Sequence, residues 1–369
     1  MKGPTLSQRK QTSDPEIDFL RRERRLEAIR SQALQSGQIQ DIGISPAGSP
    51  IPMASPTAGY YAIPMLKEPQ WSWEIPVYFF VGGAAGAAAV VAQFAQMTGV
   101  KAEIVRDGRT IAAVGSVLTP ALLISDLGVR SRFLNMLRVF KVQSPMSVGV
   151  YIVSAFATAT VLAKVANSLR QHRPGAILKI FESTSGLFSA LLGLGMATYT
   201  GVLIGATAIP VWNENIDSLP IHFALSGLGA GVSTLQMIGH EDSRSLNMLG
   251  IAASLGETIE GVRLETALKP ANEPLKKGMS GVITRLGGML SGPLPLALRV
   301  AATLAGERRS RQLVRAASAA TIAGSFLTRL GWIRAGHASA KDYRLPLQID
   351  SEQHRRLAIE SVKIDSVRA

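Results

Sequence analysis

The stretch that most constrains the fold lies between Glu74 and Lys101, where the sequence carries no other charged residue. Four glycines, Gly82, Gly83, Gly86 and Gly99, lie inside it. Each interior glycine costs a soluble helix about 1 kcal/mol relative to alanine. In a bilayer, about 20 apolar residues span the hydrocarbon, and small residues let neighbouring helices approach closely. The stretch therefore predicts a transmembrane helix that packs tightly against other helices.

The whole chain has a composition that favours a membrane protein. Hydrophobic residues make up 47% of it and charged residues 18%, whereas a soluble domain has about 25% charged residues. The net charge of +13 would indicate nucleic-acid binding if the basic residues formed a stripe with interleaved aromatic residues. They lie instead in short clusters between apolar runs, as in the loops of membrane proteins, so we expect no nucleic-acid partner.

The absence of cysteine limits the redox chemistry of the chain. It excludes thiolate-held iron–sulfur clusters, covalently attached c-type haem and cysteine nucleophiles. His222 and His240, if they lie on one helix, are about 27 Å apart at 1.5 Å per residue, so they do not ligate one haem iron. P-loop, HExxH and Rossmann glycine motifs are also absent from the sequence. We therefore expect no haem, iron–sulfur cluster or metal site in this chain.

Eight apolar stretches follow Trp71 and predict an all-α integral membrane protein with eight transmembrane helices. An even number of spans places both ends on one side, but the Lys and Arg counts at the two faces are about equal and do not indicate which side. No period of 20 to 50 residues stands out. The stretches are 75–100, 110–127, 142–166, 183–209, 218–239, 245–266, 280–305 and 313–335.

Polar tails flank the transmembrane domain, which we place at residues 71–342. Residues 1–70 predict a partly disordered tail with a possible short helix, which could instead dock a partner subunit. Its first 37 residues contain many charged residues and no short apolar region of the kind found in a signal peptide. Residues 343–369 form a second polar tail.

Ionisable side chains at the ends of the first two spans are candidate functional residues, because a charge inside a bilayer costs at least about 2.5 kcal/mol. Glu74 lies at the mouth of the first span, and Tyr78 lies one turn deeper on the same face. They either anchor the helix at the interface or line a polar pocket. Asp126 ends the second span close to Arg130 and Arg132, so it either forms a structural ion pair or belongs to a site.

Two later spans carry further candidates. Tyr199 lies inside the fourth span, where its hydroxyl needs a hydrogen-bond partner or a ligand. Glu257 and Glu260 share a face of the sixth span, and Arg263 lies three residues beyond Glu260. One carboxylate can therefore be paired while the other is left over. The leftover group is either a proton carrier or a polar contact between helices.

Four separated motifs resemble those of the NrfD/PsrC family, the membrane subunits of polysulfide, nitrite and related molybdenum oxidoreductase complexes. The motifs occur in family order over about residues 60–342. The resemblance implies two four-helix bundles in the bacterial cytoplasmic (inner) membrane, with a quinone, either menaquinone or ubiquinone, bound near one face. The motifs are YYAIPMLKEPQWSWEIPVYFFVGGAAGAA, SDLGVRSRFLNMLRVFKVQSPMSVGVYI, YTGVLIGATAIPVWNEN with LPIHFALSGLGAG, and TRLGWIRAGHASAKD.

The resemblance also implies the site residues and the partners. The quinone pocket would be built from Glu74, Tyr78, Asp126, Arg132 and Tyr199. Polysulfide reductase relatives have a histidine at the first-span position that Tyr78 occupies here. A ferredoxin-like iron–sulfur subunit would dock on the same face and connect the chain to a molybdopterin-type catalytic subunit.

The expected function is therefore a quinone-binding or quinol-binding membrane anchor subunit that exchanges electrons between the quinone pool and an iron–sulfur partner. Quinol oxidation releases two protons, so the pocket needs a titratable group with a route to water. Glu74, Asp126 and Glu257 are the candidates for this role. One alternative is a small-molecule or ion transporter, although the sequence shows no convincing pair of interrupted half-helix repeats. The other is a structural membrane anchor without quinone chemistry.

Overall fold

The computed structural model describes residues 24–29, 31–32, 35, 66–342 and 345. The chain divides into two units, residues 1–67 with 340–369 and residues 68–339. Residues 24–29 are helical, within the segment predicted to form a short helix. The remaining predictions for the two tails lie outside the described residues.

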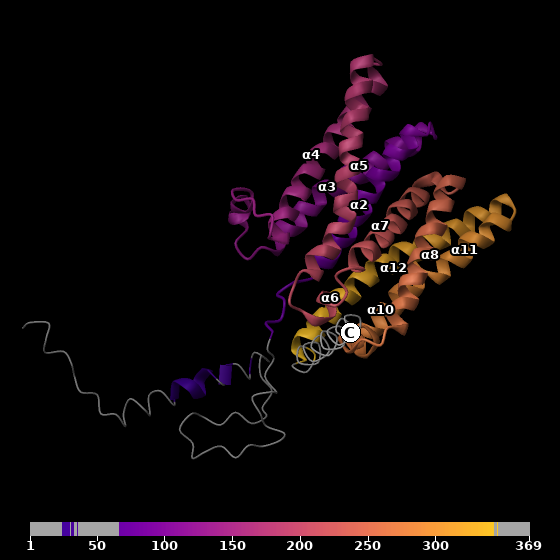
Figure 1. Cartoon of the computed structure of the whole chain (residues 1–369). Coiled ribbons are helices and arrows are strands. Elements are labelled where there is room, and N and C mark those ends of the chain that lie inside the picture. Colours follow the sequence, from indigo (N-terminus) through magenta and orange to yellow (C-terminus); the bar gives the residue numbers. More distant parts are fainter. Residues whose placement is uncertain (1–23, 30, 33–34, 36–65, 343–344, 346–369) are drawn as a thin grey trace, which may run out of the picture. The chain divides into compact units, whose positions relative to one another are not determined.

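The second unit consists of helices and their connections wherever the structure describes it, which confirms the all-α fold for this part of the chain (Figure 1). The longer helices are α2 (Glu74–Met97), α3 (Ala102–Asp126), α4 (Pro145–His172), α5 (Ala176–Gly205), α7 (Leu219–Leu235), α8 (Arg244–Thr266), α10 (Gly278–Ser291), α11 (Pro293–Leu304) and α12 (Glu307–Lys341). The short ones are η3 (Arg130–Leu137), α6 (Pro210–Asn213), η4 (Gln236–His240), η5 (Pro270–Asn272) and α9 (Glu273–Lys276).

Each of the eight predicted stretches is helical, but not all of them qualify as spans. Five helices are long and apolar enough to cross a membrane, namely α2, α3, α4, α5 and α7 continued by η4. Helices α8 and α12 carry several charged residues. The seventh stretch is interrupted at Gly292, whose ψ of −100° is not helical, and Pro293 follows it. The count of eight membrane crossings therefore stays a prediction.

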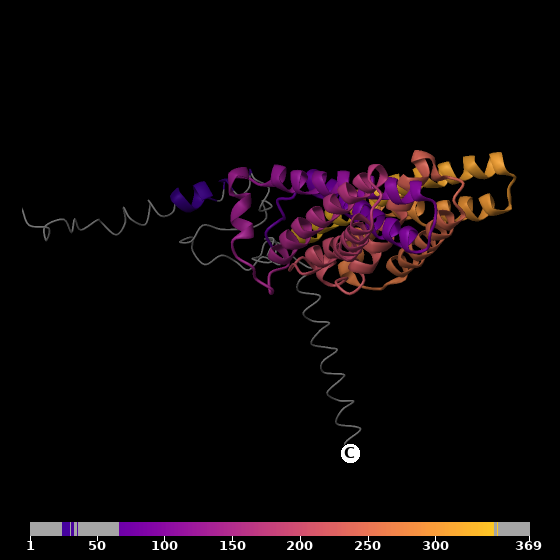
Figure 2. The same ribbon diagram turned by 90° about the horizontal axis from the view of Figure 1, so that it is seen from above.

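Helix α2 lies at the centre of the second unit. It packs against α3, α5 and α7, while α4 packs against α3 and α5. On the other side of α7, helices α10 and α11 pack against α8 (Figures 1 and 2). A Cβ atom added at Gly86 of α2 would lie 2.4 Å from the carbonyl oxygen of Gly193 in α5. The glycines in the first apolar stretch therefore allow the close helix packing that the sequence predicts.

Candidate functional site

A cavity of about 190 Å³ lies where the beginnings of α2 and α4 meet the ends of α3 and α5. We call it the first cavity. Most of its lining is apolar, and Phe133 of η3 covers part of it. Tyr78, Asp126 and Tyr199 also line it, from three different helices. The structure thus brings together three of the residues that the resemblance assigns to one pocket.

Tyr78 presents the least satisfied polar group of the first cavity. Its side chain is only 1% exposed, and the hydroxyl has no hydrogen-bond partner among the residues that the structure describes. Because Tyr78 lines the cavity, a molecule bound there could satisfy this hydroxyl.

Tyr199 already has a protein partner, because its hydroxyl donates a hydrogen bond to the backbone carbonyl of Pro145. Its ring lies against α4 at Gly149, where an added Cβ atom would come within 2.0 Å of Cζ of the ring. Glycine at this position therefore makes room for the ring. Tyr199 is therefore fixed in the cavity wall, and the hydrogen of its hydroxyl is already donated to Pro145.

Asp126 and Glu74 are linked through a residue that the sequence did not single out. The Ser72 hydroxyl lies 2.6 Å from Oδ1 of Asp126 and also contacts the Glu74 carboxylate. Both carboxylates are half-buried, and Asp126 lines the first cavity whereas Glu74 does not. Nothing in the sequence marks Ser72, because its two partners meet only after α2 and α3 have packed.

Arg132 does not line the first cavity. It is exposed on η3, and the part of the chain that the structure describes contains no ion pair between Asp126 and either Arg130 or Arg132. The ion-pair alternative for Asp126 is therefore not observed. Helix η3 instead contributes Phe133, together with Met136 and Leu137, to the cavity wall.

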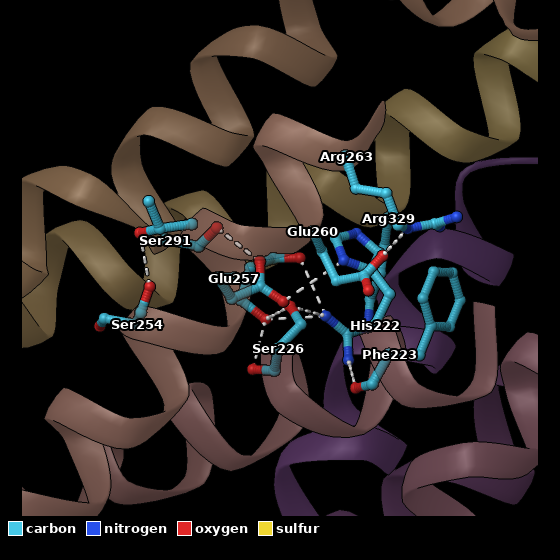
Figure 3. A network of polar contacts seen from close by, with 11 residues as sticks. His222, Phe223, Ser226, Ser254, Glu257, Glu260, Arg263, Ser291 and Arg329 are labelled. Carbon is cyan, nitrogen blue, oxygen red and sulfur yellow. Dashed lines mark hydrogen bonds and ion pairs between the residues drawn. The ribbon is translucent and has the colours of Figure 1, made fainter. Parts of the chain in front are cut away.

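Glu257 lies outside the first cavity. It is 2% exposed, accepts a hydrogen bond from the Ser291 hydroxyl at 2.7 Å, and places Oε1 3.6 Å from Nδ1 of His222 (Figure 3). Glu260 is paired with Arg263 at 2.8 Å. Arg263 thus pairs with Glu260, as the sequence predicts for one of the two carboxylates, while Glu257 has contacts of its own with Ser291 and His222. Glu257 lines a second cavity, of about 370 Å³, between α7, α8, α10 and α12.

Two buried arginines, Arg329 and Arg109, are not among the residues predicted from the sequence. Arg329 is fully buried and donates to the carbonyls of Phe79 and Phe223. Arg109, near the beginning of α3, pairs with buried Glu182, near the beginning of α5. The first cavity lies at the other ends of these two helices. An ionisable residue in an apolar stretch is a signal for such a cluster, but the partners lie too far away in the sequence to be recognised from it.

Comparisons with known proteins agree with this architecture. The family model described as polysulphide reductase, NrfD, matches residues 63–339. The C subunit of the polysulfide reductase from Wolinella succinogenes is 28% identical over 185 residues, which cover 46% of this chain and 58% of that relative. Together with its five apolar helices, the family match makes the chain a multi-pass membrane protein. Because the family model matches well over half of its length, the chain belongs to the polysulphide reductase NrfD family.

Proposed function

We propose that the first cavity binds the ring of a membrane quinone or quinol, and that the chain is the quinone-binding membrane subunit of an oxidoreductase complex. The observation that carries this proposal is Tyr78, whose buried side chain lines the cavity and whose hydroxyl forms no hydrogen bond with the described residues. A quinone oxygen would accept the hydrogen bond that this hydroxyl can donate. The phenol would thereby orient the ring.

The shape of the first cavity suits a ring with an apolar tail. Its volume of about 190 Å³ is below the roughly 300–1,000 Å³ of sites for drug-sized ligands. It would therefore hold a ring and leave an isoprenoid tail outside. The apolar lining from Ile75, Phe79 and Phe133 would exclude water from the bound ring.

The Ser72 link provides a route for the protons of a quinol. The Ser72 hydroxyl is a hydrogen-bond donor within reach of both carboxylates, so it connects Asp126 at the cavity with Glu74. We propose that Asp126 takes the proton at the cavity and that Glu74 exchanges it with water at the surface.

The electrons would leave to a partner, because the chain has no cysteine with which to hold a cluster. We propose a ferredoxin-like iron–sulfur subunit and, through it, a molybdopterin-type catalytic subunit. Exposed apolar and basic side chains of the segment from Arg130 to Lys141 support docking at this face, among them Leu134 and Phe140 at 57% and 56% exposure. We place the complex in the bacterial inner membrane, with α2–α5 as one four-helix bundle and α7, α8, α10–α11 and α12 as the second.

Two tyrosine variants test the quinone site. We expect Tyr78→Phe to reduce quinone affinity by up to about tenfold, because it removes a hydrogen bond worth about 0.5–1.5 kcal/mol. Tyr199→Phe is the matched comparison, because the Tyr199 hydroxyl already donates its hydrogen to the Pro145 carbonyl. We expect a smaller loss of quinone affinity in this variant. The measurement is a titration of the purified complex with a short-chain quinone. Equal quinone affinity in the wild type and in Tyr78→Phe would exclude this role for Tyr78. If the wild-type complex bound no quinone, the proposed function would be wrong, and a transporter or a structural membrane anchor would be the alternatives.

A further inference from the structure

The beginnings of α2 and α7 carry matching sequences. Residues 75–83 read IPVYFFVGG and residues 219–227 read LPIHFALSG. The proline, the phenylalanine and the final glycine coincide, and His222 takes the position of Tyr78. A match this short does not stand out as a repeat in the sequence alone.

The structure places the two matching segments against each other at equivalent residues. The rings of Phe79 and Phe223 lie 6.0 Å apart. A Cβ atom added at Gly227 would lie 2.9 Å from the carbonyl oxygen of Gly83. Arg329 donates to the carbonyls of Phe79 at 3.0 Å and Phe223 at 3.1 Å, so it joins the same position of both helices. Tyr78 and His222 are therefore structural counterparts, each beside a cavity.

The second cavity contains more unsatisfied polar atoms than the first. Both ring nitrogens of His222, Oε1 of Glu257 and Oγ1 of Thr328 are buried without a hydrogen-bond partner among the described residues. His222 and Glu257 are 4% and 2% exposed, and they face each other in Figure 3. Leaving such groups unsatisfied costs about 1–3 kcal/mol each. Their cluster therefore indicates a bound polar group at the buried end of the cavity.

The remainder of the second cavity is mostly apolar, with Val262, Leu264 and Met289 in its wall. The one lysine and the one arginine that line this cavity already have partners. Lys276 donates to the carbonyls of Glu265 and Ala267, and Arg285 pairs with the Glu265 carboxylate at 2.5 Å. The site thus offers hydrogen bonds at its buried end and no unpaired basic side chain for a phosphate head group. This chemistry favours a neutral, lipid-soluble molecule that carries oxygen atoms.

We propose that the second cavity is a second binding site for a ligand of the quinone class. The His222 ring and the Thr328 hydroxyl donate to ligand oxygens, and Glu257 accepts from a ligand hydroxyl. The volume of about 370 Å³ lies within the range of sites for small ligands. This inference rests on the proposed function of the first cavity for the class of ligand, and on the cluster of unsatisfied atoms for the site.

Photolabelling of the purified complex with a short-chain azidoquinone tests the second site. We expect two labelled regions, one in the helices of the first cavity and one in residues 257–293. Gly261→Leu places a side chain in the second cavity from a position where an added Cβ atom meets no other atom. It should abolish the second label and keep the first. Gly195→Leu, outside both cavities, is the matched control and should keep both labels.

His222→Phe is an independent variant that removes the hydrogen-bonding ring nitrogens, and it should also lose the second label alone. Labelling confined to the first cavity in the wild type would overturn the second site and leave the proposed function intact. Labelling of the second cavity that survives both Gly261→Leu and His222→Phe would also overturn it. Labelling of the second cavity without the first would contradict the proposed function and retain this inference.

Discussion

A single hydroxyl links the acidic residue of the first cavity to a second carboxylate nearby. Ser72 contacts both Asp126 and Glu74, which come from the end of α3 and the beginning of α2. Among the described residues, Asp126 has the Ser72 hydroxyl as a partner and forms no ion pair with a basic side chain.

We expect Asp126→Asn to leave the protein folded and assembled, because Asn preserves the size and can still accept a hydrogen bond from Ser72. Quinol oxidation per assembled complex should fall, because an amide does not exchange a proton. Ser125→Ala is a suitable control, since its hydroxyl bonds only to the carbonyl of Leu122 within the same helix. Normal turnover in Asp126→Asn would remove this residue from the site, and loss of assembly would indicate a structural role.

At the scale of helices, the first cavity depends on how closely α2 approaches its neighbours. Gly86 of α2 faces Gly193 of α5, and the backbone of each glycine lies in the space that a side chain on the other would need. This contact holds two helices that carry Tyr78 and Tyr199, the two phenols of the cavity. In a bilayer such close backbone packing replaces the hydrophobic drive that soluble helices use.

Gly86→Ala should destabilise the protein by about 1–3 kcal/mol, the usual cost of overpacking a tight core. The added methyl group would lie 2.4 Å from a backbone oxygen that cannot rotate away. At Gly195 the nearest atom to an added Cβ is a side-chain carbon of Ile152 at 3.6 Å, so Gly195→Ala should be neutral or slightly stabilising. Thermal unfolding in detergent compares the two, and equal stability would show that the contact of α2 with α5 is not tight.

At the scale of the whole molecule, the alternation of long helices predicts which connections share a membrane face. The chain has no cysteine, so single introduced cysteines report their own side. We expect Gly99, Gly175 and Gly306 to label from one side, and Gly128 and Leu268 from the other. Labelling of Gly306 together with Leu268 would show that α10 and α11 do not complete a crossing.

The face that carries the first cavity should also carry the partner subunit. Arg132 is exposed on η3 at this face and lies outside the lining of the first cavity, so its charge is available for docking. We expect Arg132→Glu to reduce the iron–sulfur subunit that co-purifies with the chain while the membrane level of the chain stays normal. Arg173→Glu, which follows α4 at the opposite face, should change neither. Co-purification lost in both variants would point to a general effect of charge.

The sequence by itself determined the helices, the membrane environment and most of the candidate polar residues. Helix formation and insertion depend on hydrogen bonds and hydropathy within one segment, and the cost of a charge in lipid marks residues such as Glu257 without knowledge of their neighbours. Only the tertiary structure decided which of these residues meet. Asp126 joins Ser72, and His222 faces Glu257 beside Thr328, because helices far apart in the sequence pack together. No local pattern encodes those contacts, since each depends on the rotation and depth of two helices at once.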